Sequence, residues 1–349
     1  MIPGEPKLDR GKVQPLRFTW LRRAVLVLSL VSLALMAVCY WAKFDACAVV
    51  TLVPGWWWAL PGIAMVGWAY WRSARRSGLL VGGLWIAFAL LTADTPVSVL
   101  RAFVRSWPTA SRSGETIRVV TLNCAGHMAE EIETLAPDIV LLQESPDRRQ
   151  VEELAQRLFG EEAVVLWGPD TSVIARGKIV PGETPKALRG GFSADRIGSF
   201  VQARVRLSGD LEVHVVSLRL RPAPLRDDLW SPDCWKQHAD HRRQRRKQLQ
   251  AVLRELDGVE PNVPIICGGD FNAPPSDAVF NLLRPKLSDA FSDGGLGWGA
   301  TLTSDWPIWR FDQVWHNEHL RAVAAVAIKT RHSDHRMVVC DLLVLPPDH

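Results

Sequence analysis

The sequence predicts an α/β fold, with a two-sheet β-sandwich core flanked by helices and preceded by an N-terminal membrane domain of about three transmembrane helices. Three observations support this prediction. Residues 25–100 carry almost no charge and are dense in Leu, Val, Ala and Trp. From about residue 115 the composition is that of an ordinary soluble domain. That later part contains many short strand-like runs and few helical ones, a pattern typical of two packed sheets covered by helices.

The 349 residues therefore divide into four predicted segments. They are a basic cytoplasmic N-terminus (1–24), a transmembrane region (25–100), a linker (101–115) and a soluble domain (116–349). The linker is assigned from a stretch rich in Pro, Ser and Gly around Arg105–Gly114. The formal net charge is only +4, so bulk charge does not indicate a partner.

Three apolar runs make up the transmembrane region: Val25–Ala42, Ala46–Trp71 and Leu79–Ala93. The first approaches the roughly 20 residues that cross a bilayer. The second contains two prolines and three consecutive tryptophans, which spanning helices and bilayer interfaces tolerate. The third is short, and it spans only if Asp94 lies at the far interface. The alternatives are two spans, a buried hydrophobic hairpin, or a cleaved signal peptide, which the two later runs disfavour.

The basic residues predict the orientation of these spans. Six of them precede the first run, namely Lys7, Arg10, Lys12, Arg17, Arg22 and Arg23. Only Lys43 follows the first run, whereas Arg72, Arg75 and Arg76 follow the second. The positive-inside rule then places the N-terminus in the cytoplasm. Three spans deliver residues 116–349 to the extracytoplasmic face, and two spans would leave them in the cytoplasm.

The soluble domain shows many strand patterns and two helix patterns. Strands are predicted at Arg118–Asn123, Ile139–Leu142, Val201–Leu207, Leu211–Leu220, Val263–Cys267, Phe311–His316, Ala322–Lys329 and Met337–Leu345. Helices are predicted at Asp147–Phe159 and His238–Leu256. Three cysteines lie in apolar strand-like runs and are expected to be small buried hydrophobic residues: Cys124, Cys267 and Cys340.

Polar residues recur at the ends of the predicted strands. They are Asn123, Glu144, Asp270 with Asn272, Asp312, and Asp334 with His335. An Asp that follows a strand is by itself more often a turn former or a cap. The motifs GGDFNA, RFDQV and SDH, after TLN and LLQE, are much more specific in this order. With them, residues 115–345 resemble the endonuclease/exonuclease/phosphatase superfamily, which includes deoxyribonucleases, abasic-site endonucleases, neutral sphingomyelinases and inositol polyphosphate 5-phosphatases.

The resemblance implies that residues 116–349 form a catalytic domain that hydrolyses phosphoesters with Mg²⁺ or Mn²⁺, hard cations that prefer oxygen ligands. It assigns Glu144 as the principal metal ligand, with Asn123 and Asp334 nearby. It assigns His335 to the phosphate side of the site and Asp312 to the orientation of that histidine. Asp270 aligns or deprotonates the attacking water, and Asn272 stabilises the transition-state oxygen. Whether Asp270 or His335 is the general base stays open at this point.

One position departs from the family pattern. The strand Val213–Leu220 is expected to end in Asn-x-His-Leu, but here it reads Ser217-Leu-Arg-Leu220, so that Arg219 replaces a histidine. An arginine cannot give up its proton at physiological pH, yet its planar guanidinium binds phosphate oxygens in a bidentate manner. We therefore expect Arg219 to contact the substrate phosphate. His214 is no substitute, because period-two alternation turns it to the opposite face.

A basic cluster lies in the second predicted helix: Arg242, Arg243, Arg245, Arg246 and Lys247. It is either a solvated helix face or a contact for anionic lipid or nucleic acid.

Membrane attachment favours a lipid or lipid-linked phosphoester as substrate, because the anchor concentrates the site at the bilayer. An extracellular nuclease is the alternative within the enzyme class, with nucleic acid as its substrate. A catalytically weak phosphate-binding module is the alternative outside it, supported only by Arg219. No feature of the sequence indicates a protein partner.

Overall fold

The structure is a computed structural model. It describes residues 16–70, 75–93, 95–105, 107, 116–127, 130–168, 170–181, 186–188, 199–207, 209–226 and 228–346. Lys7, Arg10, Lys12, Arg72, Asp94 and most of the predicted linker lie outside these residues. The chain separates into two compact units: Met1–Val38 with Gly55–Leu91, and Cys39–Pro54 with Thr92–His349.

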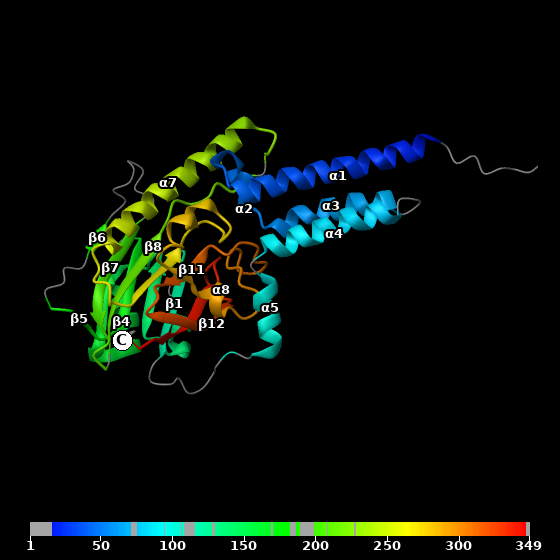
Figure 1. Ribbon diagram of the computed structural model, residues 1–349. Helices are drawn as coiled ribbons and strands as arrows, with labels where there is room; N and C mark the ends of the chain where they lie inside the picture. Colours follow the sequence, from blue (N-terminus) through cyan, green and yellow to red (C-terminus); the bar gives the residue numbers. More distant parts are fainter. Residues whose placement is uncertain are drawn as a thin grey trace, which may run out of the picture. The chain divides into compact units, whose positions relative to one another are not determined.

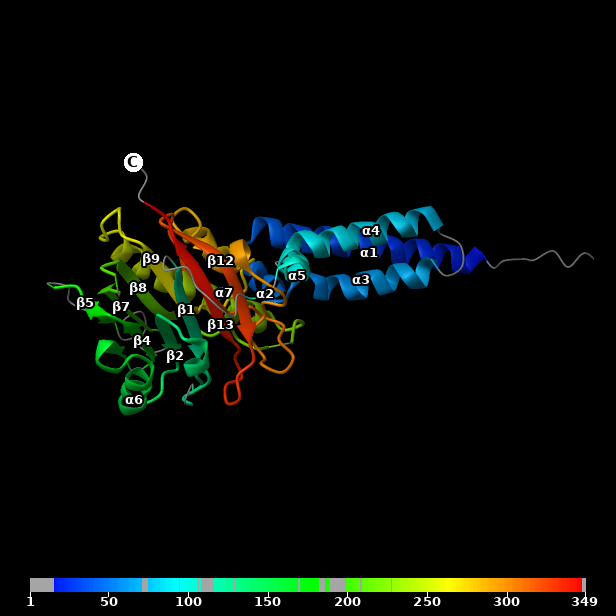
Figure 2. The ribbon, with the colours of Figure 1, turned by 90° about the horizontal axis from the view of Figure 1, so that it is seen from below.

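The first unit consists of apolar helices that run side by side (Figures 1 and 2). They are the part of α1 (Leu16–Ala42) up to Val38, α3 (Gly55–Tyr70) and α4 (Arg75–Thr92). Trp85 is buried among them and donates its indole N–H to Ser29 Oγ at 2.9 Å. A Cβ at Gly62 would lie 2.1 Å from the Trp85 ring, so only glycine allows this close approach. Outward-facing residues such as Leu28 and Leu90 are exposed apolar side chains.

The lengths of these helices bear on the number of spans. Trp20–Ala42 is long and apolar enough to cross a membrane by itself. The second apolar run is divided into two helices, Asp45–Leu52 and Gly55–Ala69, by a bend of 76°. The third lies in one helix, Arg76–Thr92, which is followed by a bend of 73° and the helix Pro96–Val104. By length and composition the described residues therefore provide one span, or up to three if each bent pair counts as one. The prediction of three spans stays a prediction.

The second unit contains two β-sheets (Figures 1 and 2). The strands of the first, in spatial order, are β12 (Leu320–Ile328), β13 (Met337–Val344), β1 (Thr116–Asn123), β2 (Ile139–Gln143), β4 (Thr171–Arg176) and β3 (Ala163–Trp167). Those of the second are β10 (Ser288–Asp289), β11 (Asp312–His316), β9 (Ile265–Asp270), β8 (Glu212–Arg219), β7 (Ser199–Arg206) and β5 (Lys178–Ile179), with β6 (Lys186–Leu188) also paired to β7. The predicted two-sheet α/β fold is confirmed.

Both faces of each sheet are buried, which explains the nearly continuous apolar strands. Alternate residues of one strand enter different cores. Val119 of β1 packs between the two sheets, whereas Val120 packs beneath α6 (Arg148–Phe159). The outer face of the second sheet is covered by α7 (Pro232–Leu256) and η4 (Ala278–Leu282). Cys124, Cys267 and Cys340 are buried, as predicted.

Most elements begin and end close to the predicted residues. Helix α6 begins with a capping box between Asp147 and Gln150, a local signal that is visible in the sequence. Helix α7 begins at Pro232, six residues before the predicted His238, with proline in its first turn. The short elements are η1 (Asp45–Cys47), α2 (Ala48–Leu52), α5 (Thr95–Val104), η2 (Glu130–Leu135), η3 (Gly160–Glu162) and α8 (Ala290–Gly294).

Two parallel strand pairs position the polar residues. β1 pairs with β2 in parallel, with Asn123 opposite Gln143, and β8 pairs with β9 in parallel, with Arg219 opposite Asp270. Parallel neighbours end at the same edge of a sheet, so each pair presents its carboxyl-terminal side chains together. Asp312, the first residue of β11, lies opposite Asp270 in the antiparallel pair β11–β9.

Candidate active site

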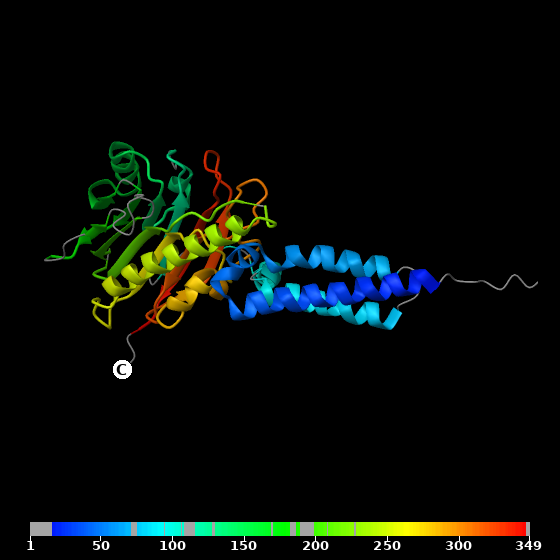
Figure 3. The ribbon, with the colours of Figure 1, turned by 90° about the horizontal axis from the view of Figure 1, so that it is seen from above.

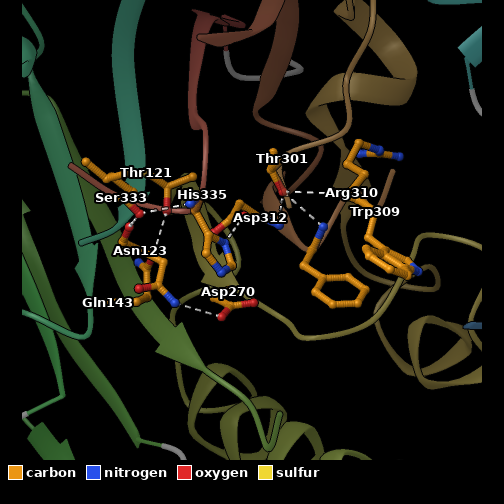
Figure 4. Close-up of polar contacts among 12 residues, drawn as sticks. Thr121, Asn123, Gln143, Asp270, Thr301, Trp309, Arg310, Asp312, Ser333 and His335 are labelled. Atoms are coloured by element: carbon orange, nitrogen blue, oxygen red, sulfur yellow. Dashed lines mark hydrogen bonds and ion pairs between the residues drawn. The ribbon is translucent and has the colours of Figure 1, made fainter. Parts of the chain in front are cut away.

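The carboxyl ends of the two parallel pairs meet through Asn123. Its amide nitrogen donates to Glu144 Oε1, from the first sheet, and to Asp270 Oδ2, from the second, each at 3.0 Å. The amide oxygen accepts the backbone N–H of Ala125 at 3.0 Å. Figure 4 shows Asn123, Asp270, Asp312 and His335 directed toward one another. One buried amide thus joins carboxylates of both sheets.

Unusual backbone conformations surround this cluster. Glu144 and Asn272 have positive φ angles of 42° and 50°, which non-glycine residues adopt at a cost. Gly269 has φ 144°, and a Cβ there would lie 1.9 Å from the carbonyl oxygen of Leu218. The GGD motif therefore allows β9 to approach β8 closely just before Asp270.

Arg219 links two acidic residues. Its guanidinium donates to Glu144 Oε1 at 2.7 Å and to Asp170 Oδ1 at 3.0 Å. Asp170 also accepts the hydroxyl of Ser199 at 3.0 Å. The Arg219 side chain is 18% exposed and the Glu144 side chain 37%, so this pair lies at the mouth of the site rather than in the core. Sequence reasoning missed Asp170, because the neighbouring strands β3 and β4 were not predicted.

Asp270 is buried and accepts several hydrogen bonds. Its Oδ1 accepts the backbone N–H of Asn272 at 2.9 Å, and its Oδ2 accepts the Asn272 side-chain amide at 2.9 Å. That amide also donates to the carbonyl oxygen of Leu220 at 3.0 Å. Burial, together with repulsion from Asp312, raises the pKa of Asp270 to about 6, although His335 and Arg219 oppose this shift.

His335 and Asp312 form a hydrogen-bonded pair. His335 Nδ1 lies 2.7 Å from Asp312 Oδ2, and both side chains are buried. Burial alone would lower the pKa of His335, but the charge and hydrogen bond of Asp312, with the charge of Asp270, raise it to about 10. The hydroxyl of Ser333 bonds to the carbonyl oxygen of Asn123 at 2.6 Å and accepts the His335 backbone N–H at 2.9 Å. This serine, absent from the sequence-based site, fixes the histidine loop to β1.

Asp334 occupies a different environment from its neighbour His335. Its side chain is exposed, and its carbonyl oxygen accepts the backbone N–H of Ser304 at 2.6 Å. It lines an open cavity of about 700 Å³ together with residues of two loops, Thr303–Trp306 and Lys329–Ser333. The structure thus brings Asn123, Glu144, Arg219, Asp270, Asn272, Asp312 and His335 into one network, with Asp334 at its border.

The donor set suits a divalent cation. Among the described residues, Asp270, Asp312 and His335 offer ligand atoms within 4.8 Å of one another. Asp312 Oδ1 is buried and has no hydrogen-bond partner among those residues. A buried carboxylate oxygen without a donor is costly, and a hard cation nearby would offset that cost.

Comparisons with known proteins bear on the family and the fold of the chain. The profile of the Endonuclease/Exonuclease/phosphatase family matches residues 120–335. A search of the curated proteins found no match. Among solved structures, humanised D. rerio TDP2 is 16% identical with a TM-score of 0.51, covering 66% of this chain and 99% of that one. The human Nocturnin catalytic domain with bound sulfate is 20% identical with a TM-score of 0.49, covering 67% and 96%. An endonuclease/exonuclease/phosphatase from Beutenbergia cavernae is 21% identical with a TM-score of 0.48, covering 66% and 72%.

The family match spans most of the second unit and includes Asn123, Glu144, Asp270, Asp312 and His335. The likeness to TDP2 independently supports the two-sheet fold. The chain therefore belongs to the Endonuclease/Exonuclease/phosphatase family and is a metal-dependent enzyme that hydrolyses phosphoester bonds.

Proposed function

We propose that this enzyme is anchored in a membrane, uses Mg²⁺ or Mn²⁺, and acts on a lipid or lipid-linked phosphoester at the extracytoplasmic face. The observation that carries the proposal is the Asn123-centred network, in which an uncharged amide and Arg219 tie together carboxylates of both sheets beside the His335–Asp312 pair. The membrane part is supported by the apolar helix Trp20–Ala42.

Glu144 and Asn123 would hold the ion, with Asp334 as a further ligand. We prefer this set to Asp270, Asp312 and His335, because the partly exposed Glu144 keeps its second carboxylate oxygen, Oε2, outside the hydrogen bonds from Asn123 and Arg219, whereas the hydrogen bond from His335 Nδ1 to Asp312 Oδ2 suits an orienting pair. Both hydrogen bonds to Glu144 reach the same oxygen, Oε1, which keeps that carboxylate in one orientation. A bound divalent ion supplies neutralisation of the negative charge that develops on the phosphoester oxygens.

Side chains of the protein perform the remaining catalytic roles. Asp270 is the general base. Its ionised carboxylate can accept a proton, and its Oδ1 accepts one hydrogen bond from the protein, so a lone pair on this oxygen stays free to bind a water. His335 donates from Nε2 to a phosphate oxygen, because Asp312 holds the proton on Nδ1. The Asn272 amide donates both of its hydrogens, to Asp270 Oδ2 and to the carbonyl oxygen of Leu220, and so fixes the position of Asp270; to stabilise the transition-state oxygen it would exchange one of these bonds.

Arg219 contacts the substrate phosphate at the mouth of the site. Its Nη atoms already bond to Glu144 and Asp170, and its Nε is buried without a partner among the described residues. The guanidinium therefore has both a fixed orientation and donor capacity left for a phosphate oxygen.

The test is a hydrolysis screen of the purified full-length chain in mixed micelles, with phosphorylated lipids and plasmid DNA in parallel. We expect Mg²⁺-dependent turnover of a phosphorylated lipid and weak, nonspecific DNA cleavage. Glu144→Ala should remove nearly all activity, and His335→Ala and Asp270→Asn should each lower kcat by about 10²–10⁴-fold. Efficient DNA cleavage without lipid turnover would make the enzyme a nuclease. Phosphate binding without turnover would make it a binding module.

A further inference from the structure

The chain between the first two apolar helices packs on the catalytic domain. We call Asp45–Leu52, which comprises η1 and α2, the clasp. It lies in the same compact unit as the two sheets, beside α7 (Figures 1 and 3). Every residue of α2 is buried. The hydroxyl of Tyr40, at the end of α1, donates to the carbonyl oxygens of Val50 and Val53 and closes the clasp on itself.

Arg242 of α7 reaches into the clasp. Its side chain is fully buried, with Nη1 donating to the carbonyl oxygen of Phe44 at 3.0 Å and Nη2 donating to Thr51 Oγ1. Arg246, one turn later, forms a bidentate pair with Asp45 at 2.6 and 3.0 Å. A buried guanidinium needs acceptors for its donors, and the clasp supplies them. The two expected roles of this basic cluster, solvated face or anionic-ligand contact, are therefore wrong for Arg242 and also for Arg245, which is buried beside Asp277.

Arg242 also connects the clasp to the catalytic loop. Its Nε donates to Asp277 Oδ2 at 3.1 Å, and the other oxygen of Asp277 caps η4 by accepting the Val279 N–H at 2.9 Å. Asp277 ends the loop that begins with Asp270 and Asn272. The position of this loop thus depends on a guanidinium that is itself held by Thr51.

A second connection is apolar. Leu52 belongs to one buried apolar cluster with Ala223, Leu302 and Phe311. Phe311 directly precedes Asp312, and its carbonyl oxygen accepts the backbone N–H of Phe271, which follows Asp270, at 3.0 Å. Leu52 therefore supports the backbone from which both Asp270 and Asp312 project.

We infer that the clasp is a positioning element of the active site, so that the hydrolase reaches full activity only with Asp45–Leu52 docked on α7. The clasp contains none of the residues assigned to the substrate or the metal, and it acts through Arg242–Asp277 and through Phe311. The inference rests on the proposed function for its kinetic test, but its structural test is independent of activity.

The test compares Thr51→Val with Thr51→Ser in the full-length chain. Valine keeps the shape of threonine and removes the acceptor for Arg242, whereas serine retains it. With bis(p-nitrophenyl) phosphate and Mg²⁺, we expect Thr51→Val to lower kcat by about ten- to a hundredfold, the scale of a small misplacement of catalytic groups. Thr51→Ser, and Lys247→Ala on the exposed face of α7, should stay within about twofold of the parent, since neither removes an acceptor from Arg242.

Hydrogen exchange of the same proteins supplies the readout that needs no activity. In Thr51→Val, and in the milder Asp45→Asn, amides of residues 270–279 and 311–316 should exchange faster, while those of β1 and β2 keep the parental rate. Parental exchange in these segments together with parental kcat would overturn the inference, and so would faster exchange throughout the domain. Absence of phosphoester turnover in the parent would refute the proposed function alone, because the exchange pattern would still decide the role of the clasp.

Discussion

Arg219 shows how one substitution changes the chemistry available at this site. A histidine at its position could protonate a departing alkoxide, whereas an arginine stays charged and only binds oxygen. Its two acidic partners, Glu144 and Asp170, hold the guanidinium at the mouth of the site. Substrates with a phosphate or phenolate leaving group need little help from an acid, and these are the ones we expect the enzyme to prefer.

Replacement of Arg219 tests this role. Arg219→Ala should lower kcat/KM by about 10²–10³-fold, the scale for removing one donor to a developing oxyanion. Arg219→His should flatten the dependence of the rate on leaving-group pKa across a series of aryl and alkyl phosphoesters. Steady-state kinetics over that series measures both effects. A nearly neutral Arg219→Ala with unchanged leaving-group dependence would show that Arg219 takes no part in the reaction.

A second residue-scale prediction concerns acid stability. Burial would raise the pKa of Asp289, but its bidentate pair with Arg310 outweighs burial and lowers it. A lowered carboxyl pKa contributes stability above the unfolded-state value of about 3.9, and this contribution is lost as the pH falls below it. At pH 7, Asp289→Asn should therefore lower the free energy of unfolding by about 3 kcal/mol, since the buried charge of Arg310 loses the carboxylate that balances it.

Between pH 7 and the acid range below about pH 4, the gap in unfolding free energy between Asp289→Asn and the parent should narrow. Denaturant unfolding followed by tryptophan fluorescence across this range measures the gap, with the exposed hairpin variant Asp210→Asn as control. A gap that stays constant with pH would mean that the pair does not depress the pKa of Asp289.

The residues of the candidate site also show how much of it could be predicted from the sequence. Asn123, Glu144, Asp270, Asn272, Asp312 and His335 were predictable because each lies in a motif at a strand end. Asp170 was not, because it lies in a turn between two short strands and nothing in its own sequence separates it from an ordinary turn former. Its importance arises only from the 3.0 Å hydrogen bond to Arg219, which is distant in sequence.

At the scale of elements, the close contact between β8 and β9 depends on Gly269. Gly269→Ala would place a Cβ 1.9 Å from the carbonyl oxygen of Leu218 at a φ of 144°. We expect a loss of at least about 1–3 kcal/mol of stability, the usual cost of such backbone strain, and a lower kcat because Asp270 follows directly. Thermal unfolding and kinetics of the variant measure these effects.

Gly258→Ala is the matched control for Gly269→Ala. Its Cβ would meet only the carbonyl oxygen of Glu255, at an ordinary 3.5 Å. Similar melting temperatures for the two variants would show that the close approach of β8 and β9 is not required.

The elements differ in how far the sequence predicts them. The long, apolar or clearly alternating strands β1, β8, β9 and β13 were predicted within a few residues. Strands β3 and β4 were missed, although they are as long as the predicted β2 and β11, because their pairing is determined by tertiary packing. The clasp was expected to be part of a spanning helix, since its Ala, Val and Leu suit a membrane and a protein interface equally well.

For the whole molecule, the decisive quantity is the number of spans that precede the sheets. If α3 and α4 each cross the membrane in addition to α1, with the clasp outside the bilayer, the number is odd and the catalytic domain lies outside the cytoplasm. A reporter that is active only outside the cytoplasm should then be active when fused at His349 and inactive when fused at Arg76. An active reporter at Arg76, or an inactive reporter at His349, would place the catalytic domain in the cytoplasm instead.

The pairing of β1 with β13 has a consequence for when the active site forms during protein synthesis. These neighbours join Thr116 to Leu343, so the first sheet has a gap between β12 and β1 until β13 has been synthesised. His335 lies just before the strand that fills this gap. Pairing over such a separation forms slowly, because most of the chain must be brought together first. We therefore expect the active site to form only after β13 has been synthesised, later than the N-terminal apolar helices.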